Sequence, residues 1–345
     1  MSDTVHGGAL TEMMTRFPNA PQPWLDLSTG INPIAYPVPQ LSTELWQRLP
    51  EAEHFSAAAQ AAAAFMGCAP TAITFTSGSQ SAISLLPDVL PARRVALLEV
   101  TYSEYASAWA RTDCEILRLP DPKALMHCEA DVICLCNPNN PDGYRWPRAD
   151  LDALVARQTE RGGWVVVDEA YADFLPSLSL AGQIDETHRL VVLRSFGKTF
   201  GLAGLRLGAL LGPQSLLHHL RQRMGPWPVS TVALEIARQA YRNTAWQHAA
   251  AARAYAGCEA LRSLLTEREL QVEGDGVLYL SVLTPQAQNL WENLARQGVY
   301  VRRFADNAAR LRFGLLADHH EFTRLRTALW SALSAIGTRN LLPSN

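Results

Sequence analysis

Short apolar runs alternate with longer helical patterns between Asp26 and about residue 212. Runs of this length, separated by helical stretches, are typical of parallel strands joined by helical crossovers. The pattern therefore predicts one sheet covered by helices on both faces. The predicted strands are 73–75, 95–100, 115–119, 132–136, 164–167, 190–193 and 207–211.

Helices are predicted between these strands and in the last third of the chain. The Ala-rich stretch 55–65 and residues 151–160, which end before Gly162-Gly163, have helical composition. One long helix is predicted over 231–265. Three further strand-like runs follow it, at 277–283, 299–304 and 311–315.

The predicted fold class is α/β, with a mostly parallel central sheet covered by helices and a smaller C-terminal α/β domain. Residues 18–39 contain six prolines and are predicted to be an extended arm. The predicted domains are therefore an N-terminal arm (1–39), a large domain (40–228) and a small C-terminal domain (229–345).

Composition narrows the possible partners. The chain of 345 residues is 48% hydrophobic and 18% charged, with a formal net charge of −3. It has no basic run, so neither nucleic acid nor an anionic membrane is an expected partner. The N-terminus lacks a basic segment followed by an apolar stretch, which predicts a cytoplasmic protein.

Cysteine and histidine spacing gives no sign of a metal site or disulfide framework. The six cysteines include no C-x-x-C pair, and we expect all of them to be reduced, buried and apolar in character. Neighbouring histidines, such as His218 and His219, diverge on a helix. No metal is therefore predicted.

Lysine usage points to the chemistry. Only two lysines occur among the 30 Lys and Arg residues, and one of them, Lys198, lies in a Gly-rich loop between two apolar runs. An amine forms a Schiff base, whereas a guanidinium does not. Ser195 precedes Lys198 by three residues and Arg206 follows it by eight. This spacing is similar to the lysine segment of pyridoxal-phosphate enzymes with the aspartate-aminotransferase fold.

Loops after the earlier strands carry groups that such a cofactor needs. Gly78, Ser79 and Gln80 open a helical stretch, where free backbone N–H groups bind phosphate. A tyrosine in the segment 102–105, for which we select Tyr105, is suited to stacking on the cofactor ring or to simple burial. Asn140, in a Pro-rich turn, is either a donor to the ring oxygen or part of a structural turn.

Asp168 ends a strand too apolar to leave a carboxylate unpaired. A protonated ring nitrogen supplies the missing cation, and at ~4 Å this pair interacts by ~4 kcal/mol at an effective dielectric near 20. The carboxylate thereby raises the pKa of the ring nitrogen by ~3 units and keeps it protonated. Tyr171 is predicted to reach the ring oxygen, while Ser195 and Arg206 suit the cofactor phosphate.

Taken in order, these motifs resemble fold-type I pyridoxal-phosphate enzymes related to histidinol-phosphate aminotransferase. The resemblance covers about residues 70–315 and implies pyridoxal 5'-phosphate as cofactor, Lys198, Asp168 and Tyr171 as catalytic residues, and a homodimer. The implied cofactor-binding residues are Gly78, Ser79, Gln80, Tyr105, Asn140, Asp168, Tyr171, Ser195, Lys198 and Arg206.

Motifs near the N-terminus resemble one particular group within this family. His6-Gly7-Gly8 and the segment from Leu25 to Pro33 look like the opening of threonine-phosphate decarboxylases of cobalamin biosynthesis. The resemblance implies a small phosphorylated amino-acid substrate, L-threonine O-3-phosphate, decarboxylated to (R)-1-amino-2-propanol O-2-phosphate. It implies that the substrate is bound by His6, Asn32, Arg302 and Arg310. Arg303 and Arg312 are expected on the surface.

Two alternatives share the cofactor contacts. One is an aminotransferase of the histidinol-phosphate type, although Asp142 stands where aminotransferases usually have threonine, and Leu49 where they usually have tyrosine. The other is a non-catalytic pyridoxal-phosphate-binding protein, which the absence of a predicted DNA-binding module disfavours. The glycines at 201, 204 and 208 do not form G-x-G-x-x-G, which argues against a nicotinamide dehydrogenase.

Overall fold

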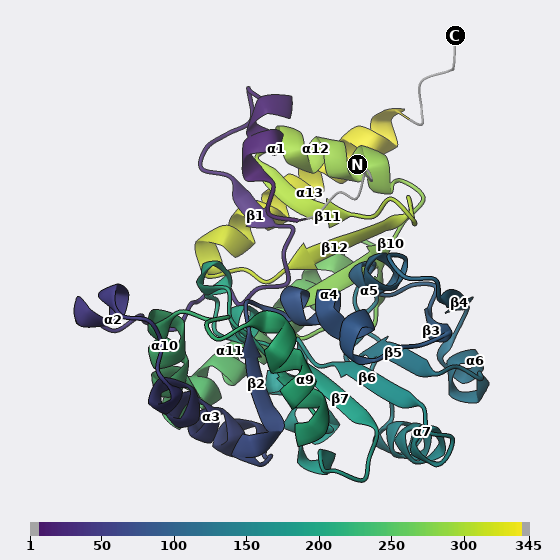
Figure 1. The fold of residues 1–345 in the computed structure, drawn as a ribbon. Helices are drawn as coiled ribbons and strands as arrows, with labels where there is room; N and C mark the ends of the chain where they lie inside the picture. The colour runs from purple at the N-terminus through teal and green to yellow at the C-terminus, as the bar shows by residue number, and fades with distance from the viewer. Residues whose placement is uncertain (1–6, 340–345) are drawn as a thin grey trace. The chain divides into compact units, whose positions relative to one another are not determined.

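The computed structural model describes residues 7–339 (Figure 1). Internal contacts group these residues into two units, one comprising 35–249 and the other comprising the residues up to 34 together with those from 250 onward. The domain bounds expected from the sequence, 1–39, 40–228 and 229–345, stay a prediction.

A seven-stranded sheet forms the centre of residues 35–249, in the order β2-β8-β7-β6-β5-β3-β4 (Figure 1). Pairing is parallel between β3 and β4, β3 and β5, β5 and β6, and β6 and β7. All seven strands lie at or near their predicted positions. Their bounds are β2 (Ile73–Thr76), β3 (Arg94–Leu98), β4 (Glu115–Leu119), β5 (Val132–Cys136), β6 (Trp164–Asp168), β7 (Leu190–Ser195) and β8 (Gly208–Leu211).

Strand β8 departs from the parallel pattern, since it pairs antiparallel with both β2 and β7. The chain passes from β7 to β8 through only α8 (Phe196–Thr199) and the 3-10 turn η5 (Ala203–Leu205). A parallel neighbour needs a longer crossover, usually an α-helix, which this connection lacks. Strand β8 therefore runs opposite to β7, and the sheet is mostly parallel.

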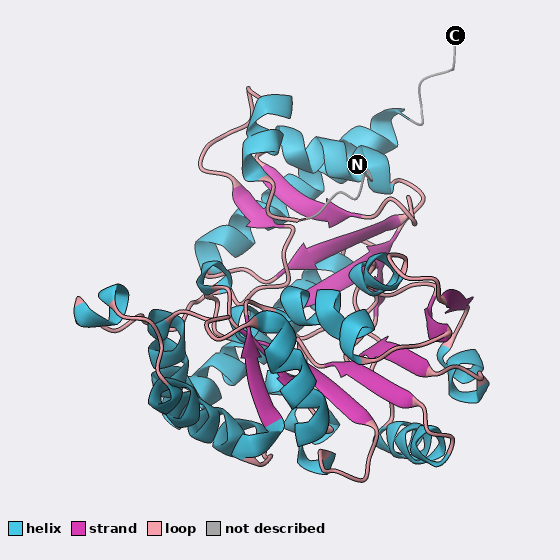
Figure 2. Cartoon of the chain, viewed as in Figure 1, coloured by secondary structure: helices cyan, strands magenta, loops and turns pink. Residues whose placement is uncertain are grey.

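Helices cover both faces of this sheet (Figure 2). The helices α3 (Ala52–Met66), α7 (Arg148–Glu160) and α10 (Thr231–Arg242) bury apolar side chains on one face. The helices α4 (Ser79–Val89), α5 (Glu104–Trp109) and α9 (Gln214–Met224) do so on the other. All five residues of β5 are buried, as expected for a strand covered on both sides.

A second sheet, of order β1-β11-β12-β10-β9, lies in the other unit. Its strands are β1 (Leu25–Leu27), β9 (Gln271–Glu273), β10 (Tyr279–Leu283), β11 (Val299–Arg303) and β12 (Arg310–Gly314). Sequence analysis predicted β10, β11 and β12 but missed the two three-residue edge strands. Strand β1 belongs to the predicted arm, where it pairs in parallel with β11.

The predicted single helix over 231–265 is wrong, because α10 ends at Arg242 and α11 (Thr244–Thr266) begins after Asn243. Asn243 has φ −88° and ψ 74°, which are not helical values. Its side-chain Oδ1 accepts a hydrogen bond from the backbone N–H of Trp246 at 3.0 Å. This is the geometry of a helix N-cap, so the asparagine divides the segment.

Five further helices complete the two units in the described part of the chain. They are α1 (Leu10–Arg16), α2 (Glu44–Gln47), α6 (Pro122–His127), α12 (Ala287–Arg296) and α13 (His319–Arg339). Among the helices of residues 7–339, none combines the length and the apolar character needed to cross a bilayer.

The cysteines are all free thiols, as predicted. The prediction that all six are buried is wrong for three of them. Cys134, Cys136 and Cys258 are buried, whereas Cys68, Cys114 and Cys128 are partly exposed. The first two lie two residues apart on β5 and pack into the same apolar cluster.

Candidate active site

The predicted cofactor-binding residues gather at one edge of the seven-stranded sheet. Strands β2, β3, β5, β6 and β7 run in the same direction, so their carboxyl ends lie at this edge. Ligands of open α/β sheets bind at such an edge. The loops that leave these strands carry the predicted residues from Gly78 to Lys198, and Arg206 lies just before β8 begins.

Gly78 opens the candidate phosphate site at the N-terminus of α4. It has φ 80° and ψ 159°, a conformation that favours glycine. A Cβ at this position would lie 2.6 Å from Nη2 of Arg206, so a side chain here would force the guanidinium to shift. Ser79, the first residue of α4, has its side-chain hydroxyl unbonded within residues 7–339. The first N–H groups of a helix attract anions.

Arg206 completes this corner of the site. Its backbone is left-handed, with φ 53° and ψ 55°, and its Nη1 donates to the carbonyl of Ala203 at 3.0 Å. The guanidinium is thereby held over Gly78 while the side chain stays exposed. A helix start, a bare backbone and a fixed guanidinium together fit a phosphate group.

Asp168, at the end of β6, is only 5% exposed. Burial raises the pKa of its carboxyl group to about 6, against the opposing effects of the Ala170 N–H, the Tyr105 hydroxyl and the charge of Lys198. The Ala170 N–H donates to Asp168 Oδ1 at 2.9 Å. Without a further cation the carboxyl group loses its charge as the pH falls through about 6. A positive charge beside it would keep it ionised.

Lys198 lies in the short helix α8, directly after β7. Its Nζ is 5.7 Å from the centre of the buried Tyr171 ring, which follows β6. Ser195, three residues before the lysine, is 9% exposed, and its hydroxyl makes no hydrogen bond to the described part of the chain. The structure thus brings Asp168, Tyr171 and Lys198 to neighbouring strand ends.

Tyr105 does not lie where sequence analysis expected it. It is 1% exposed and packs in the apolar cluster with Trp109, so neither face of its ring is open to a ligand. Its hydroxyl lies close enough to Asp168 to lower the pKa of that carboxyl group, yet it makes no hydrogen bond of full geometry. The predicted stacking role of Tyr105 is therefore wrong.

Tyr102 is the tyrosine that sequence analysis passed over. It is partly buried, and its hydroxyl donates to Gln80 Oε1 at 3.0 Å. Gln80 in turn donates to Glu104 Oε2 at 2.8 Å. The side chain of Gln80 therefore holds Tyr102 in place, and its backbone N–H lies in the first turn of α4. The Tyr-x-x-Tyr spacing gave two candidates, and only burial separates them.

The turn after β5 is fixed by Asp142 and Asn139. Asp142 Oδ1 accepts hydrogen bonds from Asn139 Nδ2 at 2.8 Å and from the Tyr144 N–H at 3.0 Å. Asn139 also donates to the carbonyl of Val100 at 2.9 Å. The aspartate found where aminotransferases usually have threonine thus closes the turn that presents Asn140 at the sheet edge.

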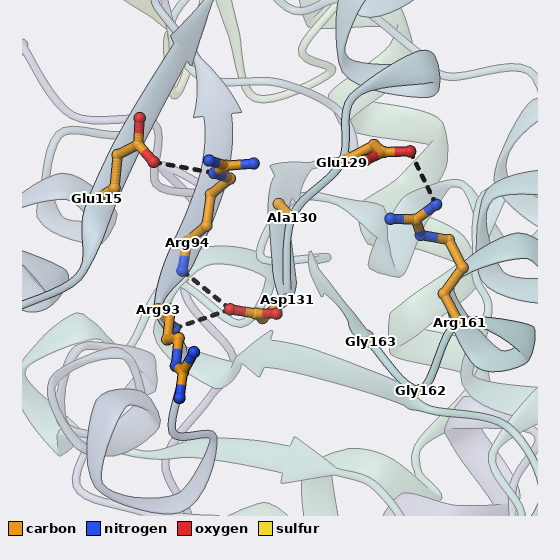
Figure 3. Close-up of a pocket in the computed structure, with 9 residues that line it drawn as sticks. All are labelled: Arg93, Arg94, Glu115, Glu129, Ala130, Asp131, Arg161, Gly162 and Gly163. Carbon is orange, nitrogen blue, oxygen red and sulfur yellow. Dashed lines mark hydrogen bonds and ion pairs between the residues drawn. The ribbon is translucent and has the colours of Figure 1, made fainter.

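A pocket of about 340 Å³ lies at the opposite edge of the sheet, where β3, β5 and β6 begin (Figure 3). Its arginines and acids pair with one another, as in Arg94–Glu115 at 2.9 Å and Arg161–Glu129 at 3.1 Å. The Asp131 carboxylate accepts the N–H groups of Arg93 and Arg94. None of the predicted site residues lines this pocket, so we do not assign it to the active site.

The predicted substrate-binding residues belong to the unit that contains β1. Asn32 is 7% exposed, and its Oδ1 accepts the Ile34 N–H at 3.1 Å. Arg310 is 6% exposed, and its Nε lies 2.9 Å from Glu273 Oε2. The Glu273 carboxylate therefore offsets part of the positive charge of Arg310. His6 lies outside the described residues.

Arg312 is a candidate that sequence analysis placed wrongly on the surface. It is 6% exposed, with its guanidinium 4.8 Å from the Tyr279 ring centre and 5.9 Å from that of Phe304. It lies directly across from Arg302 in the ladder between β11 and β12, and the Arg302 guanidinium is 5.2 Å from the same Phe304 ring. Two like charges placed opposite each other favour an anion between them.

The N-terminal glycines approach the same place. A Cβ on Gly7 would collide with the carbonyl oxygen of Ser28, and the Gly8 N–H donates to Ser28 Oγ at 2.7 Å. Arg312 Nη2 donates to that same carbonyl at 3.3 Å. The Gly-Gly motif is thus needed to let the arm pack against the backbone next to Arg312.

Comparisons with known proteins show the family of the chain. A model of the aminotransferase class I and II family matches residues 25–329. The chain is 37% identical over 325 residues to threonine-phosphate decarboxylase from Pseudomonas aeruginosa, covering 94% of this chain and 96% of that protein. It is 38% identical over 329 residues to threonine-phosphate decarboxylase from a Sinorhizobium species, with coverage of 94% and 97%.

A solved structure gives the same fold. Histidinol-phosphate aminotransferase from Sinorhizobium meliloti, in complex with pyridoxal-5'-phosphate, superposes with a TM-score of 0.84 at 17% identity and covers 94% of each chain. The chain belongs to the class I and II aminotransferase family. The predicted α/β fold class is confirmed.

Proposed function

We propose that the protein is a pyridoxal-phosphate-dependent decarboxylase that converts L-threonine O-3-phosphate to (R)-1-amino-2-propanol O-2-phosphate. The observation that carries this proposal is the 37% and 38% identity to threonine-phosphate decarboxylases over 94% of the chain. The convergence of Asp168 and Lys198 at one sheet edge supports it.

The cofactor phosphate fits the corner formed by Gly78, Ser79 and Arg206. Unbonded hydroxyls at Ser79 and Ser195 and the backbone N–H groups that open α4 supply donors, while Arg206 supplies charge. We assign Asn140 and Tyr171 to the ring oxygen.

The ring fits between Asp168 and an aromatic side chain. The Asp168 carboxyl group, whose pKa burial raises to about 6, needs a cation to stay charged at lower pH, and a pyridinium nitrogen provides one. We assign stacking to Tyr102 in place of Tyr105, because Tyr105 is enclosed in the core. When bound, pyridoxal phosphate supplies a protonated ring that withdraws electrons from the substrate's amino-bearing carbon.

Lys198 has two tasks in this proposal. Its Nζ holds the cofactor before the substrate arrives, and it delivers a proton to the amino-bearing carbon once carbon dioxide has left. The nearby Tyr171 ring restricts where the lysine amine can move. Asp168 keeps the ring nitrogen protonated throughout.

Substrate anions are assigned to Arg302 and Arg312. Threonine phosphate carries a carboxylate and a phosphate, and the cross-strand pair supplies two guanidinium groups for them. Arg310, selected from the sequence, pairs with Glu273 at 2.9 Å and stays a proposed substrate contact beside these two arginines. Asn32 and His6 of the arm remain proposed substrate contacts.

We expect Arg302→Ala to damage threonine phosphate far more than unphosphorylated threonine. Losing a charge-assisted contact to the phosphate costs about 1.5–3 kcal/mol, so the ratio of kcat/KM for the two substrates should fall about tenfold or more. Arg312→Ala should weaken both substrates alike, since both carry the carboxylate.

Arg303→Ala is the matched control, because this neighbouring arginine stacks on Trp291 at 4.2 Å and bonds to Gln288. It should leave the ratio unchanged. Steady-state kinetics with both substrates provide the measurement. An unaltered ratio in Arg302→Ala would mean that the phosphate is bound by other residues.

A homodimer, a cytoplasmic location and a place in cobalamin biosynthesis belong to the same proposal. Large apolar side chains in the unit comprising 35–249 support a dimer. Val38, Trp46, Leu49 and Trp227 are 55%, 69%, 58% and 58% exposed. Exposing these apolar side chains to water is unfavourable for a monomer, whereas a second copy of the chain would bury them.

The function is tested by supplying the purified protein with pyridoxal phosphate and threonine phosphate, with and without 2-oxoglutarate. We expect carbon dioxide and a phosphorylated amine in both cases. Glutamate formation that depends on 2-oxoglutarate would instead identify an aminotransferase.

A further inference from the structure

Three charged side chains are buried directly behind the candidate cofactor site. Arg194 Nη1 lies 2.7 Å from Asp173 Oδ1, and Arg194 Nε lies 3.4 Å from Glu169 Oε2. The side chains of Arg194 and Asp173 are 4% exposed, and that of Glu169 is 0% exposed. We call these three residues the buried ion cluster.

Strand alternation puts the buried ion cluster on the face opposite Asp168. The last ladder pair between β6 and β7 is Asp168 with Leu193, and the next N–H, that of Glu169, donates to the Leu193 carbonyl at 2.9 Å. Successive residues of a strand point to opposite faces. Asp168 and Ser195 therefore share one face, while Glu169 and Arg194 share the other.

Ser179 extends the cluster to the loop after β6. Its hydroxyl donates to Glu169 Oε2 at 2.7 Å and accepts from Arg194 Nη2 at 3.1 Å. The Leu180 N–H donates to Glu169 Oε1 at 2.6 Å. One arginine thus ties the segment that follows Asp168 and carries Tyr171 to the strand that leads into Lys198.

Burying three charged side chains carries a large desolvation cost. Buried ion pairs contribute little net stability compared with apolar side chains of similar size, but breaking one partner is strongly destabilising. Burial raises the pKa of both Glu169 and Asp173, and Arg194 opposes that effect. Apolar side chains of similar size would stabilise the fold at least as well. The buried ion cluster therefore has a role other than stability, and the geometry that it imposes on the two segments suggests which.

We propose that Arg194, Glu169 and Asp173 are positioning residues that set where Lys198 stands relative to Asp168, and hence how efficiently the lysine captures the cofactor. Each member lies within four residues of a group assigned to cofactor chemistry. The inference rests on the proposed function only through the assignment of Asp168 and Lys198. It adds an arginine that touches neither cofactor nor substrate.

Other polar groups line the cluster. Cys68 and Tyr241 lie close enough to Arg194 for its charge to act on their pKa values, and Thr199 bonds to Asp173. Burial raises the pKa of Cys68 to about 11, so it stays a neutral thiol at ordinary pH. Arg194 is the cation that lowers the pKa values of both carboxyl groups.

The test measures covalent capture of pyridoxal phosphate by the apoprotein at saturating cofactor. Borohydride reduction followed by peptide mass spectrometry reports the fraction of Lys198 that is modified. A lysine displaced by about 1 Å should react roughly tenfold to a hundredfold more slowly. We expect this slowing in Arg194→Lys, which keeps the charge but loses the planar fork, and a smaller slowing in Glu169→Gln.

Leu154→Ala is the control, because this fully buried leucine of α7 carries no charge and belongs to neither of the segments that hold the buried ion cluster. It should lose stability yet capture cofactor at the wild-type rate per folded molecule. The pH midpoint of the bound cofactor's visible absorbance should shift in Arg194→Lys and Glu169→Gln but not in Leu154→Ala.

Wild-type capture rates and midpoints in both cluster variants would overturn the inference. If Arg194→Lys does not fold, Glu169→Gln decides alone, since it keeps the size of the side chain. Failure of the wild-type protein to trap cofactor on Lys198 would instead overturn the site assignment, so the two failures are distinguishable.

Discussion

Lys198→Ala is expected to abolish both the visible absorbance of the covalent linkage between pyridoxal phosphate and the lysine and all turnover. The absorbance arises from the bond between cofactor and lysine, and alanine cannot form that bond. The same substitution also removes the group assigned to deliver the proton. Absorbance titration with pyridoxal phosphate and an assay of carbon dioxide release provide the measurements.

The chain offers a matched control in its other lysine. Lys123 is exposed on α6, outside the candidate site, so Lys123→Ala should leave absorbance and turnover unchanged. A Lys198→Ala protein with an unaltered cofactor spectrum would refute the assignment of this lysine.

Asp168→Asn should retain pyridoxal phosphate while turnover falls about a thousandfold. An amide cannot stabilise a protonated ring nitrogen, and the lost interaction is worth ~4 kcal/mol for charges about 4 Å apart. The phosphate contacts and the Lys198 bond remain, so cofactor binding persists. Single-turnover kinetics at saturating cofactor measure the change in the chemical step.

Asp152→Asn serves as the control for charge removal alone, since Asp152 pairs with Arg148 on α7 and its side chain is 44% exposed. It should retain full turnover. Near-wild-type activity in Asp168→Asn would show that this carboxylate is not the partner of the ring nitrogen.

The sheet could be predicted because its strands are covered on both faces and therefore stand out as apolar runs. Strand β5 is buried at every position and lies at its predicted residues. Strand β1 could not be found in this way, because it has three residues in a Pro-rich arm and its pairing with β11 joins segments far apart in the chain. Such an edge strand depends on its partner more than on its own sequence.

Some candidate site residues could be selected from local sequence, whereas others needed the structure. Asp168 and Lys198 could be selected from the sequence as candidates, because a carboxylate or an amine directly after an apolar run indicates specific chemistry. The proposed roles of Tyr102 and Arg312 depend on side-chain surroundings that the sequence does not show. Each is close in sequence to the residue first selected, and the sequence does not show that Tyr105 is enclosed in the core or that Arg310 pairs with Glu273.

The prediction of one helix over 231–265 was wrong because of a single residue. Residues 231–265 have helical composition throughout, so composition alone predicts one helix. Asn243 interrupts it because its side chain caps the following helix through the Trp246 N–H. Asparagine inside a helical pattern is compatible with either outcome, and the packing of Trp246 on Phe200 and Tyr36 favours the break.

The most direct test of decarboxylation at Lys198 is a reaction in deuterium oxide with threonine phosphate labelled in its carboxyl carbon. We predict labelled carbon dioxide and an amine that carries one deuteron, at the carbon from which the carboxylate left, for each molecule released. Lys198→Ala should give neither product. Label retained in a keto acid, with glutamate formed from 2-oxoglutarate, would contradict decarboxylation and identify an aminotransferase.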